Sequence, residues 1–275
     1  MNRTVRWLLF LLLTAVFQQA GQAQEFRVYT RVYDVSAGKA TSKPLARSLS
    51  LFHAGSVYDY IQTAGEVTIF NPVRHQFTIL STSRGVVTTV QFDALKHMLK
   101  MARGVTRQRL AELRRQTAPR SQTLFSQLQF QLSPRFVESY DSESKRLRLA
   151  SRFVNYTARC AEVDPSRASV YLRYADWAAR LNYVLRPHVL LPQCRLALND
   201  GLRRRNAVPV AVELRTGLAP RIHLRADHQI RWQLDRNDKS LIFEWKTLLK
   251  GDRLRRVPFR EYQKTMLVAQ SRHRR

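Results

Sequence analysis

The sequence predicts an α+β fold: a large curved antiparallel sheet of about eleven strands, with helices packed on its concave face. In many short segments apolar and polar residues alternate with a period of two, which is typical of half-buried strands. Gly, Asn and Pro turns join most of these segments, which favours antiparallel neighbours. Apolar residues at helical spacing interrupt the pattern in only two places and near the end. A sheet of this size must twist and curl.

The first third of the chain predicts six strands on short connections. Ala54-Gly55 and Asn71-Pro72 are typical turn residues, since Gly accepts a positive φ and Pro fixes φ near −65°. The predicted strands are residues 26–33, 47–53, 56–61, 65–70, 75–81 and 86–91.

The period then changes to that of a helix. From Asp93 apolar residues recur every three or four positions as far as Leu113, with Gly104 as a possible break and Pro119 as the end. Period-two alternation resumes over residues 123–132, and we expect three strands at 123–132, 135–140 and 145–156.

Asp164-Pro165 predicts a strong helix start, because Asp caps free N–H groups and Pro needs no partner at the first position. This helix should end near Arg186, and a second should follow over 192–205. We expect strands at 208–214 and 222–234, a short helix at 241–251 and a disordered basic tail at 270–275. No long linker divides the chain, so residues 24–269 should form a single domain.

The first 23 residues have the three parts of a secretory signal: a basic start, an apolar run over 7–17, and small residues before a cleavage site after Ala23. The apolar run is shorter than the roughly 20 residues that span a bilayer. We therefore expect a periplasmic or extracellular protein with no transmembrane span once the signal is removed.

The chain of 275 residues carries a formal net charge of +27. Such a charge attracts nucleic acid, anionic lipid surfaces or acidic polymers, and export argues against nucleic acid. The basic residues are spread along the chain, so they are equally compatible with an ordinary solvated surface.

The segment from His53 to Tyr60 places Gly55, Tyr58 and Tyr60 ahead of the Asn71-Pro72 turn. A Gly turn, an aromatic-rich strand and a Pro turn in this order, in an exported chain, resemble the periplasmic lipoprotein-carrier family. The resemblance covers residues 26–91. It implies a half-open barrel with helices in its concavity, and it carries over no functional residue.

No sequence motif indicates catalysis. The seven histidines include no HExxH pair, and the GxSxG, Walker A and GxGxxG motifs are absent. We expect no cofactor, no metal site and no enzyme activity. An unrecognised hydrolase remains an alternative, because 20 scattered acidic residues can form a pair that sequence does not reveal.

The two cysteines are expected to be separate, mostly buried thiols. Cys160 precedes the predicted helix of about 30 Å that begins at Asp164, whereas Cys194 begins the next helix. The intervening loop is too short to bring them within the Cα separation of about 7 Å that a disulfide needs.

The leading hypothesis is a non-catalytic envelope protein that holds a lipid or another amphiphile in an apolar concavity. Its basic exterior would favour anionic envelope surfaces. The alternative is a basic structural or binding protein for acidic envelope polymers. Core packing explains the large apolar residues equally well, but the candidates for lining a concavity are Leu128, Phe130, Leu132, Trp177, Ile230, Trp232 and Leu234.

Overall fold

The computed structural model describes residues 24–36, 43–186, 190–217 and 221–272. The expected signal peptide, residues 1–23, lies outside the described residues, as do residues 273–275 of the expected tail. Residues 270–272 belong to the last helix.

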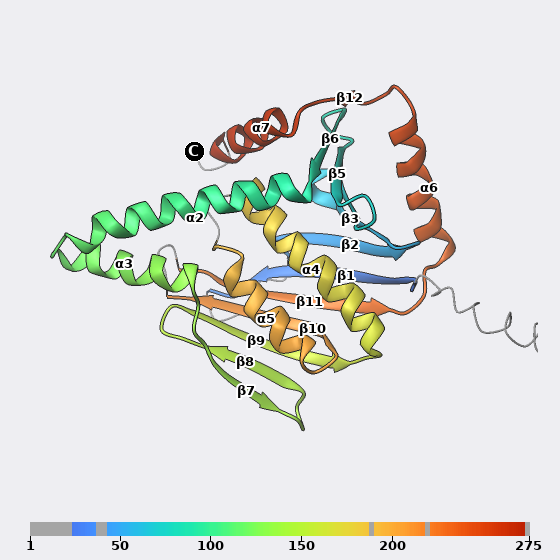
Figure 1. The fold of residues 1–275 in the computed structure, drawn as a ribbon. Coiled ribbons are helices and arrows are strands. Elements are labelled where there is room, and N and C mark those ends of the chain that lie inside the picture. Colours follow the sequence, from blue (N-terminus) through green and yellow to red (C-terminus); the bar gives the residue numbers. More distant parts are fainter. Residues whose placement is uncertain (1–23, 37–42, 187–189, 218–220, 273–275) are drawn as a thin grey trace, which may run out of the picture.

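Twelve strands form one open sheet in the described part of the chain, in the order β12-β6-β5-β4-β3-β2-β1-β11-β10-β9-β8-β7 (Figure 1). All neighbours are antiparallel except β12 and β6. The predicted α+β class with a large antiparallel sheet is therefore confirmed. The strands are β1 (Phe26–Asp34), β2 (Ala46–His53), β3 (Ser56–Ile61), β4 (Glu66–Asn71), β5 (Gln76–Ser81), β6 (Val86–Gln91), β7 (Val137–Asp141), β8 (Arg146–Ala150), β9 (Val154–Glu162), β10 (Ala207–Thr216), β11 (His223–Arg231) and β12 (Arg255–Arg256).

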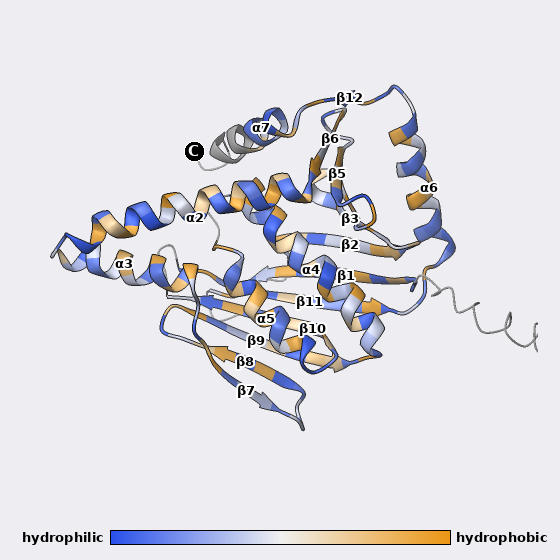
Figure 2. Ribbon diagram, in the orientation of Figure 1, coloured by the Kyte–Doolittle hydropathy of each residue, from blue (hydrophilic) through white to orange (hydrophobic). Residues whose placement is uncertain are grey.

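Helices α2 to α5 lie on one side of the sheet, which we call the inner face (Figure 1). Hydrophobic and hydrophilic residues alternate along α2 and α6, as expected for amphipathic helices (Figure 2). The helices are η1 (Gln62–Ala64), α2 (Phe92–Arg114), α3 (Pro119–Leu132), α4 (Pro165–Leu185), α5 (Gln193–Arg203), α6 (Arg236–Lys250) and α7 (Phe259–Arg272).

The period-two pattern of the strands divides the core into two clusters. In β2, Phe52 packs inward with α4, whereas Leu51 packs outward against α6. The larger cluster lies between the inner face and α2, α4 and α5. The smaller one joins Ile242 and Trp245 of α6 to the outer side chains of β2 to β5. Helices therefore cover both faces of β2 to β5.

Helix α4 starts where the sequence predicts. The Asp164 carboxylate accepts a hydrogen bond from the Ser166 N–H at 2.9 Å, and Pro165 is the first helical residue. The helix ends at Leu185 and lies across the inner face of the sheet (Figure 1). Helix α4 forms one wall of a cavity against the sheet.

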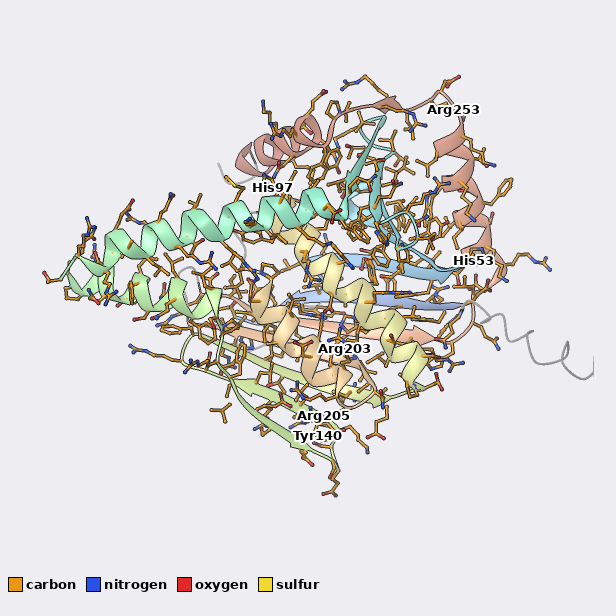
Figure 3. All side chains as sticks on the ribbon, viewed as in Figure 1. His53, His97, Tyr140, Arg203, Arg205 and Arg253 are labelled. Carbon is orange, nitrogen blue, oxygen red and sulfur yellow. The ribbon has the colours of Figure 1, made fainter. Side chains whose placement is uncertain are left out.

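At its C-terminal end, α5 is tied to β7 by arginines (Figure 3). Arg205 donates to Glu138 Oε1 at 2.8 Å, and its guanidinium lies 4.6 Å from the centre of the Tyr140 ring. These contacts place α5 over the β7–β9 part of the sheet.

The predicted strand over residues 123–132 is wrong, because this segment is helix α3. Pro119 occupies its first turn rather than ending a segment. The segment is rich in Leu and Gln, which favour helices, and its one β-branched residue is Thr123. Alternation alone could not distinguish the two structures, because Phe125, Leu128 and Leu132 also fit helical spacing.

Several other boundaries differ from expectation. Helix α2 continues through Gly104, and residues 145–156 divide between β8 and β9. The expected strand over 222–234 ends at Arg231, and the helix expected at 241–251 begins at Arg236 under an Asp235–Asp238 capping box. The pairing of β10 with β9 is irregular between Pro209 and Ala211, where Pro has no N–H for the ladder.

Among the described residues, no helix is both long and apolar enough to cross a bilayer.

Candidate functional site

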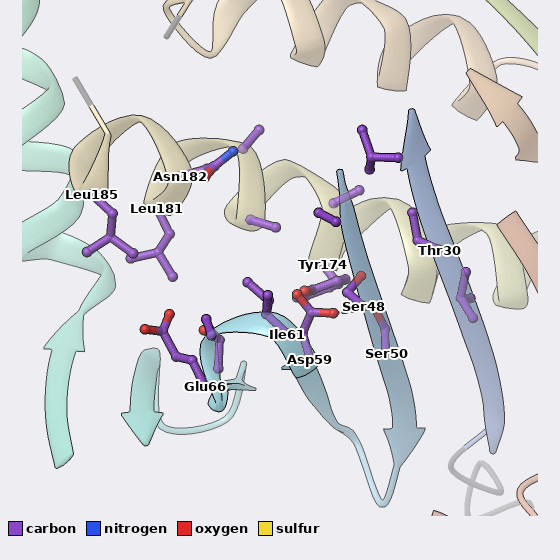
Figure 4. A pocket seen from close by; sticks show the side chains of 18 of the residues that line it. Thr30, Ser48, Ser50, Asp59, Ile61, Glu66, Tyr174, Leu181, Asn182 and Leu185 are labelled. Atoms are coloured by element: carbon purple, nitrogen blue, oxygen red, sulfur yellow. Dashed lines mark hydrogen bonds between the residues drawn. The ribbon is translucent and has the colours of Figure 1, made fainter. Parts of the chain in front are cut away.

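A cavity of about 500 Å³ lies between α4 and the inner face of β1 to β5 (Figure 4). Helix α4 lines it from Tyr171 to Leu185, Arg186 follows the helix, and α5 contributes Arg195. At a rise of 1.5 Å per residue, the lining part of α4 is about 21 Å long. Both its size and its partly apolar walls are typical of a small-molecule site.

The wall formed by α4 is apolar and recessed. Ala175, Ala178 and Ala179 face the sheet where larger side chains would fill the gap, and Leu181 and Leu185 extend the apolar wall toward the end of the helix. Phe77 adds an apolar surface from the sheet. Small residues at these helix positions are the local reason that a cavity exists.

The opposite wall, on the inner face of the sheet, carries a polar cluster among apolar residues such as Val28 and Ile61. Ser50 and Asp59 are direct partners on β2 and β3, and the Ser50 hydroxyl donates to Asp59 Oδ1 at 2.7 Å. Tyr174 of α4 also hydrogen-bonds Asp59, and Figure 4 shows these side chains together. Burial raises the pKa of Asp59, and the hydrogen bonds from Ser50 and Tyr174 oppose that shift. Ser48, Thr30 and Thr68 complete this wall.

Glu66 lines the cavity near Leu181 and Leu185, and its charge is compensated (Figure 4). The Arg84 guanidinium donates to its carboxylate at 2.9 Å, and the Tyr262 hydroxyl of α7 donates to the same oxygen. Burial raises the pKa of Tyr262 far above its ordinary value. This cluster fixes α7 against β4 and gives the Glu66 carboxylate a cation of its own.

A second polar group surrounds Arg195. Its Nε donates to Asn199 Oδ1 at 3.1 Å, and its guanidinium is within hydrogen-bonding reach of the Tyr171 hydroxyl. Among the described residues, Arg195 forms no ion pair with an acid.

His228 of β11 is the neighbour of Thr30. The Thr30 hydroxyl lies 2.8 Å from Nδ1 of the His228 ring, and the buried Nε2 of the same ring has no partner in the described part of the chain. Burial, aided by the Arg195 charge, lowers the pKa of His228 to about 4, so this ring is neutral at pH 7.

The cavity reaches the surface near the end of α4, where Asn182 is exposed and Arg186 is half-buried. A ligand could therefore enter at this end without displacing the core.

The residues expected to line a concavity lie elsewhere, and none of them lines this cavity. Leu128, Phe130 and Leu132 are half-buried on α3 rather than on a strand. Ile230 and Trp232 pack with the inner core, Trp232 beside Phe26, whereas Leu234 packs with the outer cluster under α6. Trp177 stacks on Phe92 at 3.8 Å between ring centroids and borders a second, basic hollow of about 400 Å³.

Two signals in the sequence could have indicated the cavity. Thr30, Ser48, Ser50 and Asp59 are polar at positions that share a face with core residues such as Phe52. On α4, small residues repeat on the face turned toward the sheet. Neither signal has meaning until the strand order and the position of α4 are known.

Thr30 and His228 form a hydroxyl–imidazole pair beside the cavity, but a ring with a pKa near 4 is a weak base at neutral pH. No carboxylate hydrogen-bonds its other nitrogen within the described ranges. No three His, Cys, Asp or Glu side chains there are grouped to hold a metal ion. Both cysteines are buried free thiols, and burial raises the pKa of each, that of Cys194 to about 12.

No protein-family model matches this sequence, and no curated protein is significantly similar to it.

Proposed function

We propose that this chain is an exported, non-catalytic binding protein of the cell envelope that holds a lipid or another amphiphile in the cavity beneath α4. The observation that carries the proposal is a cavity of about 500 Å³ whose lining combines the alanine and leucine face of α4 with a cluster of hydrogen-bonding side chains on β2 and β3. An amphiphile matches this division, since its chain can lie against Ala175, Ala178 and Leu181 while its polar group meets hydrogen-bonding side chains. The resemblance to lipoprotein carriers belongs to the same proposal.

The test is extraction of the purified full-length protein with organic solvent, followed by mass spectrometry. Ala178→Phe places a ring in the cavity and should abolish or strongly reduce the extracted amphiphile. Ala111→Phe is the matched control, because Ala111 is exposed on another helix, α2, and should leave the amount unchanged. A wild-type protein that carries no amphiphile and takes up none from added lipid would contradict the proposal.

A second candidate function, the binding of an acidic envelope polymer, is favoured by the outer face of β1, β2 and β8 to β11. Arg31 lies directly opposite Arg47, and Arg146 lies directly opposite Arg159, although like charges in such positions are destabilising. None of these four arginines forms an ion pair within the described ranges, although Asp227 lies opposite Arg31 and Asp141 lies opposite Arg146 on the neighbouring strands. The buried Nε of Arg31 has no hydrogen-bond partner in the described part of the chain. A bound polyanion would offset the repulsion in both pairs.

This candidate predicts salt-sensitive binding to an acidic polysaccharide such as alginate. The double variant Arg31→Ser/Arg47→Ser should bind at least about tenfold more weakly, whereas Arg107→Ser/Arg114→Ser removes the same charge from exposed positions on α2 and should bind nearly as well. Equal weakening in both variants would indicate only non-specific attraction to net charge.

A further inference from the structure

The Arg195 side chain is an unusual element of a cavity wall. It is half-buried, it faces a partly apolar cavity, and no acid within the described ranges pairs with it. A charge removed from water is costly unless an opposite charge or several hydrogen bonds compensate it. Asn199 and Tyr171 supply neutral partners only, so the compensation is incomplete.

The surroundings of Arg195 favour an anion over a second cation. Tyr171 is buried beside the guanidinium, so its hydroxyl is positioned to donate to the same ligand oxygen. The neutral His228 ring leaves Arg195 as the charged group at this end of the cavity among the described residues. Asp59 hydrogen-bonds Ser50 and Tyr174 rather than Arg195, although its charge also acts on Tyr171.

The other acidic groups near this end of the molecule do not neutralise Arg195. The Glu66 carboxylate accepts hydrogen bonds from Arg84 and Tyr262, and it lies near Leu181 and Leu185 rather than near Arg195 (Figure 4). Asp176 is linked to Arg195 only through Asn199: its carboxylate accepts a hydrogen bond from the Asn199 amide at 2.7 Å and forms an ion pair with Arg203. Arg195 therefore hydrogen-bonds Asn199 and does not contact the Asp176 carboxylate directly.

From these contacts we infer that the cavity selects an amphiphile with an anionic head group, which binds Arg195 and the Tyr171 hydroxyl while its chain lies along the alanine face of α4. The inference rests on the proposed function and names its ligand class. Arginine suits the role, because its planar guanidinium can donate two parallel hydrogen bonds to a carboxylate or a phosphate.

The experiment compares three probes of equal chain length: hexadecanoate, hexadecan-1-ol and hexadecylamine. Delipidated wild-type protein should bind the acid at least about tenfold more tightly than the alcohol, since charge-assisted hydrogen bonds exceed neutral ones. Arg195→Met keeps the aliphatic stem and should lose this preference while still binding the alcohol. Arg173→Met is the matched control, because it removes an equal charge from the exposed side of α4, outside the cavity lining, and should retain the preference.

Tyr171→Phe gives a second route if Arg195→Met does not fold, and should reduce the acid preference without abolishing alcohol binding. Circular dichroism and thermal melting establish that each variant is folded. Equal affinity for acid and alcohol in the wild type would overturn the inference but leave the proposed function standing. Tighter binding of the amine, lost in Asp59→Asn, would overturn it in favour of a cationic ligand. Binding of none of the three probes would overturn both.

Discussion

His228 provides a pH-dependent test of the inner face beside the cavity. Burial lowers its pKa from 6.5 to about 4. In the unfolded chain the ring takes up a proton below pH 6.5, whereas in the folded protein it stays neutral down to about pH 4. The unfolded state therefore binds more protons in this window, and acid favours unfolding.

The magnitude follows from the difference between the two pKa values. A difference of about 2.5 pH units corresponds to about 3 kcal/mol, at about 1.4 kcal/mol per unit. The contribution of the neutral ring is complete above pH 6.5 and is lost as the pH falls toward 4. The raised pKa of Asp59 acts in the opposite direction, because its protonation favours the folded state.

The assay is urea unfolding of the wild type and His228→Asn at intervals from pH 7.5 to 4. The Asn amide can still hydrogen-bond the Thr30 hydroxyl, but it does not titrate in this pH range. The free energy of unfolding of the wild type minus that of the variant should fall by about 3 kcal/mol as the pH decreases. Asp59 is common to both proteins and cancels in the difference. A difference that stays constant over the whole range would refute the buried, neutral assignment of His228.

Three further substitutions test contacts around the sheet. Arg84→Met leaves the buried Glu66 carboxylate without its cation, and should cost about 3–5 kcal/mol in urea unfolding near neutral pH. Asp164→Ala removes the cap of α4 and should lower the free energy of unfolding by about 1 kcal/mol, whereas conservative Asp164→Asn should recover most of it. Arg27→Met leaves Asp238 at the start of α6 without its ion pair at 2.8 Å, and should lower the melting temperature and increase amide hydrogen exchange in α6 before the inner core.

Each of these results has an outcome that contradicts its reasoning. Lys96→Met removes an exposed ion pair and is the control for Arg84, since it should cost at most about 1 kcal/mol. Equal losses in the two would mean that the burial of Glu66 has no energetic role. Unchanged stability in Asp164→Ala, or exchange in α6 that does not respond to Arg27→Met, would contradict the other two predictions.

The sequence by itself determined the local elements that depend on near neighbours. Strands β3 and β6 lie at the predicted residues, because two-residue periodicity and a turn residue such as Gly55 act over only a few positions. The start of α4 was equally local, since an Asp cap and a Pro at the first position act within one turn. Where two local patterns coincided, as in α3, the sequence could not choose between them.

The tertiary structure alone decided where the cavity lies and which residues line it. Ser50, Asp59, Tyr174 and Arg195 come from four elements, and only strand pairing and helix packing bring them together. The outer position of α6, which removes Leu234 from any inner lining, also depends on contacts between distant segments. The same holds for the pKa of His228 and the opposed pairs of arginines, because burial and register are properties of the assembled sheet rather than of any short segment.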